Sequence, residues 1–284
     1  MLSERATNGA PGTRLVLKVA GGKRKSYGSS IKKPEEVLTR NPIIKVLSVM
    51  HGCRVRFLLM GGQACVVYGG SEFSRDTDIA ILPDRKNLNH LDAALSELHA
   101  ELIAVPRLTL ESLLKGHAIH FRCKHPDAMN MRIDIMSVLR NAPPFETLWK
   151  RRTTMELSNG LIVNVVSLPD LVAIKKTQRD KDWSHVRRLV EAHYLENREK
   201  SLPEHVRFWL AEARTPEILR QLATENPKLI NELQKQRELF RLLPNCSDDE
   251  LSAALIEEEK KAREADRAYW RPLLEELEKI RHTR

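Results

Sequence analysis

The sequence lacks the long apolar run that a membrane-spanning helix requires. Such a helix needs about 20 consecutive apolar residues, and the longest candidate, Phe57 to Tyr68, is interrupted by Gly61, Gly62 and Gln63. The first residues carry charges and no apolar core, so no secretory signal is expected. A cytoplasmic protein without membrane association is therefore expected.

Cysteines and aromatic residues are also few. The four cysteines are widely spaced and form no CxxC pair, which argues against a disulfide framework and favours reduced thiols in a cytoplasmic protein. Aromatic residues make up only 5% of the chain, and Trp183, Trp209 and Trp270 lie in segments of helical pattern. We interpret these tryptophans as helix-packing residues rather than as platforms for stacked bases.

Positive charge is abundant but unevenly distributed. Residues 1–40 hold nine Lys or Arg against three Glu, a local charge of +6, which leaves +3 of the total +9 for the other 244 residues. Residues 1–33 are interpreted as a basic flexible tail, either simply solvated or contacting the phosphates of a possible RNA acceptor.

The chain after the tail divides into a mixed half and a helical half. Apolar runs and turn residues predict strands at 54–60, 76–82, 118–123, 131–138 and 161–166, with helices at 34–50, 63–68 and 87–100. Ser167 begins a capping-box pattern, and from residue 182 nearly every segment is helical in pattern. The last predicted helix begins at Ser247 and is expected to bend at Pro272. The fold class predicted is α+β, with a core at 34–195 and a helical C-terminal region at 196–284.

Asp76 and Asp78 form the first part of a candidate site. Side chains alternate along a strand, so these two carboxylates point to the same face. Two neighbouring carboxylates repel each other unless a cation lies between them, and magnesium prefers such oxygen ligands. On a later strand the apolar residues face one way and Asp134 the other. Three carboxylates from two strands are typical of a site that binds two Mg²⁺ ions.

Gly61 and Gly62 form the second part, because they open a short helix after an apolar strand. Glycines at a helix N-terminus let backbone N–H groups approach phosphate oxygens. His120 and Arg122 share one face of another predicted strand, and beside Asp134 they would line the acceptor side of the site.

The order of these motifs resembles the signature of the DNA polymerase beta-type nucleotidyltransferase superfamily. In that signature an apolar strand, Gly-Gly or Gly-Ser and a short helix precede Ser/Thr-x-Asp-x-Asp, with Ser74 here in the Ser/Thr position. The chain is most similar to small bacterial proteins resembling abortive-infection toxins, which carry a Pro-Asp-Leu-x-Ala-x-Lys segment that ends here at Lys175. The resemblance covers roughly residues 55–195 and departs from the usual pattern at Gln63.

The resemblance implies a nucleotidyltransferase-type mixed sheet flanked by helices and a magnesium-dependent enzyme. It would move a nucleoside monophosphate from an NTP to a hydroxyl and release pyrophosphate. The metal ligands and catalytic residues would be Asp76, Asp78 and Asp134. By the same resemblance, the groups that contact the triphosphate or neutralise its charge would be Gly61, Gly62, Ser74 and Lys175.

The acceptor remains open among RNA such as tRNA, a protein and a small molecule, and a toxin–antitoxin context is one expectation. A different class of function is a non-catalytic nucleotide-binding or interaction module on the same fold. The acidic triad argues against that alternative, because a module without catalysis has no need of a self-repelling carboxylate cluster.

Overall fold

The structure is a computed structural model that describes residues 14–16, 42–71, 73–157, 160–243 and 245–282. Most of the predicted basic tail and the first part of the helix predicted at 34–50 therefore lie outside the described residues. Within the described residues a mixed sheet of eight strands has the order β1-β7-β8-β2-β3-β6-β5-β4. The strands are β1 (Arg14–Val16), β2 (Phe57–Met60), β3 (Asp76–Ile81), β4 (Ala100–Leu102), β5 (Ile119–Cys123), β6 (Arg132–Met136), β7 (Thr153–Glu156) and β8 (Ile162–Val165).

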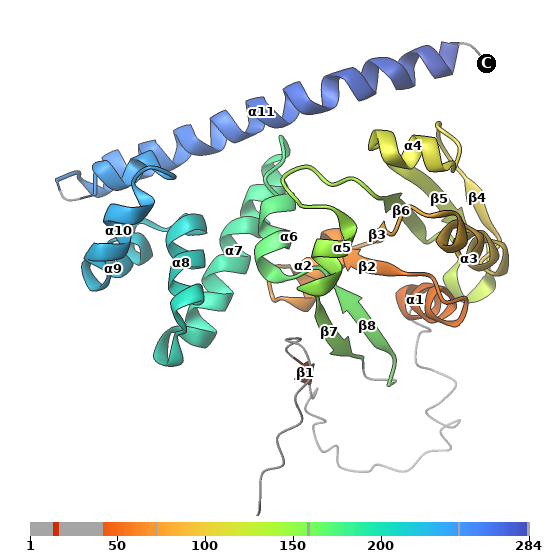
Figure 1. Cartoon of the computed structure of the whole chain (residues 1–284), viewed down its shortest axis with the longest axis horizontal. Helices are drawn as coiled ribbons and strands as arrows, with labels where there is room; N and C mark the ends of the chain where they lie inside the picture. The colour runs from red at the N-terminus through yellow and green to blue at the C-terminus, as the bar shows by residue number, and fades with distance from the viewer. Residues whose placement is uncertain (1–13, 17–41, 72, 158–159, 244, 283–284) are drawn as a thin grey trace, which may run out of the picture.

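Helices flank this sheet and continue beyond it, which confirms the α+β class with a helical C-terminal region (Figure 1). The first group comprises α1 (Pro42–Gly52), α2 (Gly61–Val67), α3 (Arg85–Glu97), α4 (Leu110–Lys115), η2 (Pro126–Ala128), α5 (Phe145–Lys150) and α6 (Leu168–Ile174). The second group comprises α7 (Asp180–Asn197), η3 (Arg198–Lys200), α8 (Pro203–Glu212), α9 (Pro216–Glu225), α10 (Pro227–Leu233), η4 (Glu238–Arg241) and α11 (Asp248–His282).

The two faces of the sheet differ in chemistry because side chains alternate along each strand. One face is apolar, with fully buried residues such as Ile79, Ile133 and Ile135, and it belongs to the same core as the apolar residues of α1 and α3. The other face carries the side chains between them, including Asp78 and Asp134. The alternation thus delivers the acidic residues to the face opposite the main core.

Several local predictions hold in the structure. Proline is the first residue of α1, as its lack of an N–H favours. Ser167 caps α6 and accepts a hydrogen bond from the N–H of Asp170. The strand β1 lies within the predicted tail and pairs in parallel with β7 at one edge of the sheet. Three short strands, β1, β4 and β7, were not predicted.

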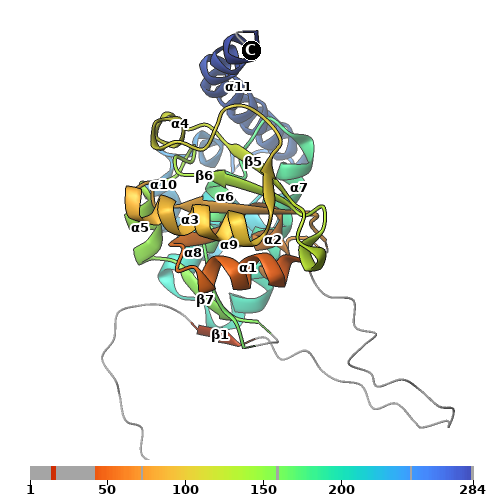
Figure 2. The same cartoon turned by 90° about the vertical axis from the view of Figure 1, so that its right-hand side faces the viewer.

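The C-terminal helix α11 is long and continuous, and it contains Pro272 within its 35 residues. In both views it lies at one end of the molecule and β1 at the opposite end (Figures 1 and 2). Among the described residues no helix is both apolar enough and long enough to cross a membrane.

Candidate active site

The pairing of three strands aligns a row of polar side chains across the sheet. The parallel pairing of β3 with β6 places Asp78 opposite Asp134 and Asp76 opposite Arg132. The antiparallel pairing of β6 with β5 places His120 opposite Asp134. Neighbouring strands lie about 4.8 Å apart, so Asp78, Asp134 and His120 form one row across three strands. We call it the carboxylate row.

Gly61 and Gly62 approach this row too closely for any side chain. Gly61 has a φ of +65°, and a Cβ built on it would lie 1.9 Å from Oδ2 of Asp78. A Cβ on Gly62 would lie 2.3 Å from Oγ of Ser74. The N–H of Gly62 donates to Oδ2 of Asp78 over 3.2 Å. Glycine is therefore required at these positions for the start of α2 to approach the carboxylate of Asp78.

Gln63, the residue at which the chain departs from the pattern it resembles, forms a hydrogen bond to the loop before β3. Nε2 of Gln63 donates to the carbonyl oxygen of Ser74 over 2.9 Å, and the Gln63 side chain is buried. The hydroxyl of Ser74 faces the carbonyl oxygen of Asp76 at 3.4 Å. Gln63 thus holds the loop that leads into the two acidic residues of β3.

The two carboxylates that face each other across β3 and β6 have opposite environments. Burial raises the pKa of the Asp78 carboxyl, and the negative charge of Asp134 raises it further. Burial also acts to raise the pKa of Asp134, but hydrogen bonds from His120 and Arg132 outweigh it and lower that pKa. Arg132 Nε lies 2.7 Å and His120 Nδ1 2.9 Å from Oδ1 of Asp134. Asp134 is thus the stably ionised member of the pair.

A cavity of about 340 Å³ opens on one side of the carboxylate row, beside Gly61 and Asp78. Lys175 lines it, but this side chain is only 6% exposed and its Nζ lies 3.0 Å from Oδ1 of the fully buried Asp182. The lysine therefore lies in the same cavity as Gly61 and Asp78, with Asp182 as its anionic partner. In the resemblance, the segment that ends at Lys175 precedes a Lys-Asp pair, here Lys181-Asp182. The ion pair between Lys175 and Asp182 itself was not predicted.

The C-terminal helix supplies part of the wall of this cavity. Asp266, Trp270 and Leu274 of α11 line it, opposite residues of the sheet half. Trp270 was interpreted as a packing residue, but it borders the cavity. In the sequence these three residues are four positions apart, which places their side chains on one side of a helix. Buried packing faces show the same spacing, so this pattern alone does not identify a cavity wall.

The donor chemistry suits magnesium, although no metal-binding set is assembled. Among the residues that the structure describes, no group of three or more His, Cys, Asp or Glu side chains is arranged to hold a metal ion. Asp76, Asp78 and Asp134 are nevertheless carboxylates at adjoining positions of two strands, and carboxylate oxygens are the ligands Mg²⁺ prefers. Burial, and then repulsion from the charge of Asp134, raises the pKa of Asp78. A cation there would relieve that repulsion, and it would compete with Arg132 for Asp134.

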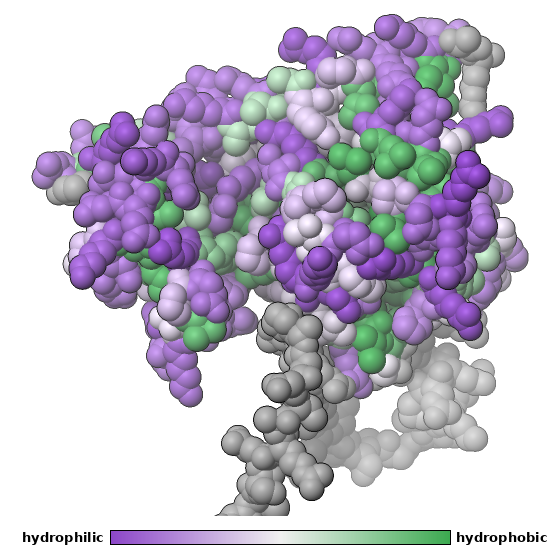
Figure 3. All heavy atoms as spheres, viewed as in Figure 1, coloured by the Kyte–Doolittle hydropathy of each residue, from purple (hydrophilic) through white to green (hydrophobic). Residues whose placement is uncertain are grey.

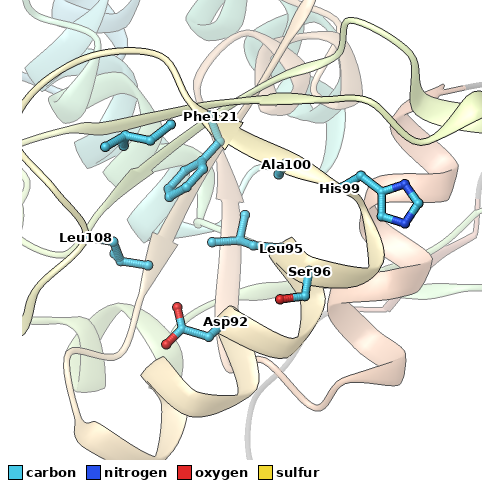
Figure 4. A pocket seen from close by; sticks show the side chains of 8 residues that line it. Asp92, Leu95, Ser96, His99, Ala100, Leu108 and Phe121 are labelled. Atoms are coloured by element: carbon cyan, nitrogen blue, oxygen red, sulfur yellow. The ribbon is translucent and has the colours of Figure 1, made fainter.

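A second cavity, of about 390 Å³, lies beside α3, β4 and β5 (Figure 4). Leu95, Leu108 and Phe121 surround it, and Asp92 is the one carboxylate among its lining residues. None of the predicted site residues lines this cavity. It lacks the acidic pair that would connect it with phosphate chemistry.

Comparison with known proteins adds little. No protein-family model and no curated protein matches the chain. Among solved structures, the chain is similar to the solution structure of the antibiotic-resistance factor ANT(2'')-Ia, with a TM-score of 0.29 and 13% sequence identity over 72% of this chain and 93% of that one. A likeness this distant carries no weight for function, which has to be argued from the site itself.

Proposed function

We propose that the protein is a magnesium-dependent nucleotidyltransferase that moves a nucleoside monophosphate from an NTP to a hydroxyl acceptor. One observation carries the proposal. Asp78 faces Asp134 across two parallel strands, and its carboxylate fills the space that a side chain on Gly61 would need. Such close approach of a glycine-opened helix to an acidic pair is the arrangement that phosphate and a divalent cation would use together.

Different residues of the chain would bind the triphosphate and the metal ions. Gly61, Gly62 and Ser74 would border the terminal phosphates, and Lys175 would offset part of their charge. Asp76, Asp78 and Asp134 would hold two Mg²⁺ ions. When bound, the metal would align the triphosphate and lower the pKa of the acceptor hydroxyl.

Asp134 is suited to orienting the acceptor, because it stays ionised next to His120 and Arg132. The acceptor oxygen forms a bond to the α-phosphorus. The bond from that phosphorus to its bridging oxygen breaks, and pyrophosphate leaves with the electron pair. The hydroxyl proton passes to solvent.

The acceptor side is defined by charge. His120, Arg122 and Arg132 share the open face of β5 and β6, and Arg122 is exposed with no ion-pair partner among the described residues. The two arginines disfavour a polycationic small molecule and favour an acceptor whose hydroxyl lies beside a phosphate, such as the end of an RNA strand. A protein acceptor is the alternative that the labelling experiment separates.

The test is transfer of label from α-labelled NTPs to total cellular RNA and protein. Asp78→Asn and Asp134→Asn should each abolish labelling while the thermal unfolding curve stays cooperative. Asp92→Asn is the control, because Asp92 borders only the second cavity. Full labelling by Asp78→Asn would refute the proposed mechanism.

One observation favours a different class of function. Oxygen Oδ1 of Asp134 is already held by Arg132 and His120, so a module that binds nucleotide without transferring it is the second candidate. Calorimetric titration with each NTP, with and without Mg²⁺, distinguishes the two. Magnesium-dependent binding without label transfer to any fraction would support the module.

A further inference from the structure

The helix α11 is fastened across the sheet half by two polar anchors. Asp266, only 2% exposed, accepts hydrogen bonds from Nη1 of Arg140 at 3.0 Å and from the N–H of Gln178 at 2.8 Å. Ten residues further on, Glu276 lies 2.8 Å from Nζ of Lys115. The partners of Asp266 and Glu276 are residues of the α/β half. The segment of α11 between Asp266 and Glu276 is therefore held over the cavity.

The segment between the anchors presents an oriented aromatic ring. Nε1 of Trp270 donates to Oδ1 of Asp266 over 3.1 Å, which fixes the indole at the cavity wall. Leu274 lines the same wall one turn further along the helix. Apolar surface also gathers beneath α11 toward α4 (Figure 3). The N–H of the indole is thus already bonded, which leaves the apolar part of the ring to line the cavity.

The cavity is lined by two kinds of residue. Gly61, Asp78 and Lys175 connect it with the carboxylate row, whereas Met136, Leu139 and Trp270 give it apolar surface. Its volume of about 340 Å³ is within the range of small-molecule sites, which combine apolar walls with a few polar groups. A ligand that matches both kinds of residue has an aromatic ring joined to a polyphosphate. Asp134 and His120 do not line the cavity, so it is distinct from the acceptor side.

Given the nucleotidyl transfer proposed above, on which this inference rests, we propose that α11 forms the base-binding wall of the nucleotide site. The nucleobase lies against Trp270 and Leu274, and the phosphates extend toward Gly61 and Asp78. The helix thereby makes the C-terminal region a part of the site and gives it a role in selecting the nucleotide.

The experiment compares a ligand that has a base with one that lacks it. Binding of each NTP and of inorganic tripolyphosphate, both with Mg²⁺, is measured by calorimetry for the full-length protein. Trp270→Ala should weaken the binding of the preferred NTP about ten-fold or more, since stacking on an aromatic residue contributes on the order of 1–3 kcal/mol. It should leave tripolyphosphate binding unchanged. Trp270→Phe keeps an aromatic ring and should stay within about three-fold of the wild type.

Two controls separate the possible failures. Ile256→Ala changes an exposed residue of α11, 68% accessible, and should alter neither affinity. Asp78→Asn should weaken both ligands, and if it weakens neither, the proposed function itself fails. If Asp78→Asn weakens both ligands but Trp270→Ala weakens neither, or weakens both equally, α11 is not the base-binding wall. Leu274→Ala tests the same wall with less risk to the fold and should lower only NTP affinity, by a few-fold.

Discussion

The two sides of the carboxylate row are built in different ways. The covered side is a largely apolar cavity, and residues far apart in the chain, such as Gly61, Lys175 and Trp270, meet there. The open side is polar, and its residues lie on two neighbouring strands, where His120 and Arg132 contact Asp134. A largely apolar cavity suits a small aromatic ligand, whereas an open basic face can admit a macromolecule. One row of carboxylates can thus serve two ligands of different chemistry.

The largest effect on transfer should come from adding a single methyl group at Gly61, next to the carboxylate row. In Gly61→Ala the new Cβ would meet the Asp78 carboxylate, in a backbone conformation that alanine disfavours. We expect transfer to fall about 100-fold, the order of loss that follows a misplacement of about 1 Å, and the free energy of unfolding to drop by about 1–3 kcal/mol. Initial rates of labelling and urea denaturation measure the two effects.

The matched control is Gly52→Ala at the end of α1, where a Cβ would meet no atom within 4 Å. It should leave both the rate and the stability nearly unchanged. If Gly61→Ala behaved like this control, the close approach of Gly61 to Asp78 would have no role in catalysis.

The second effect tests how far the covered side is structural. In Lys175→Met the fully buried Asp182 loses one of its cations and keeps Thr177 and Arg179. Breaking a buried ion pair costs about 3–5 kcal/mol, and we expect the lower end because two partners remain. Denaturant unfolding should show this loss, and Lys175→Met with Asp182→Asn should recover much of it.

The surface pair of Lys45 and Glu97 offers the comparison, with side chains 28% and 53% exposed. Lys45→Met should cost at most about 1 kcal/mol, as exposed ion pairs do. Equal costs at the two lysines would mean that Lys175 is not a structural cation and is free to serve the triphosphate alone.

The third effect concerns the open side. Arg122→Ala should lower RNA labelling several-fold at low salt and reduce the salt dependence of RNA binding by about one phosphate contact. Binding of NTP and tripolyphosphate should not change, because Arg122 does not line the cavity. Arg85→Ala removes an exposed arginine at the start of α3 and serves as the control. An equal loss of NTP affinity in Arg122→Ala would show that the two sides are not separate.

The sequence predicts the carboxylate row because its determinants are local. Strand alternation places Asp76 and Asp78 on one face and Asp134 on the corresponding face of another strand, and the glycine pair is adjacent in sequence to an apolar strand. The register that sets Asp78 opposite Asp134 agrees with this expectation. These features need only the period of a strand and the steric freedom of glycine.

The covered side was not predicted because its determinants are non-local. The position of α11 depends on hydrogen bonds from Arg140 and Gln178 to Asp266, across more than 80 residues of sequence. From sequence alone, a line of Asp266, Trp270 and Leu274 is indistinguishable from a packing face. The short strands β1, β4 and β7 were missed for a related reason, because three or four residues are too few to show a period.

The smallest expected effect is a loss of stability at acidic pH, caused by a buried histidine of the helical region. Burial, and then the charge of His205, lowers the pKa of His193 to about 4, and Nε1 of Trp209 donates to its Nδ1 over 2.9 Å. In the unfolded chain histidine titrates near pH 6.5. Between pH 6.5 and pH 4, His193 therefore binds a proton in the unfolded state but not in the folded state. Its contribution to the free energy of unfolding is complete above pH 6.5 and is lost as the pH falls toward 4. The expected loss is about 1–2 kcal/mol, reduced by partial exposure of the ring.

His193→Gln should flatten this acid-side slope in urea denaturation between pH 7 and pH 5, and the exposed His51→Gln should not. We expect the effect to reach the cavity beside Asp78 through α11, because Glu258 of that helix pairs with Arg214 and Arg237 of the helical region. Mild acid should thus weaken NTP binding in the wild type more than in His193→Gln, while RNA binding on the open side follows the same course in both. If RNA binding also diverged between the two proteins, the two sides of the row would be coupled rather than independent.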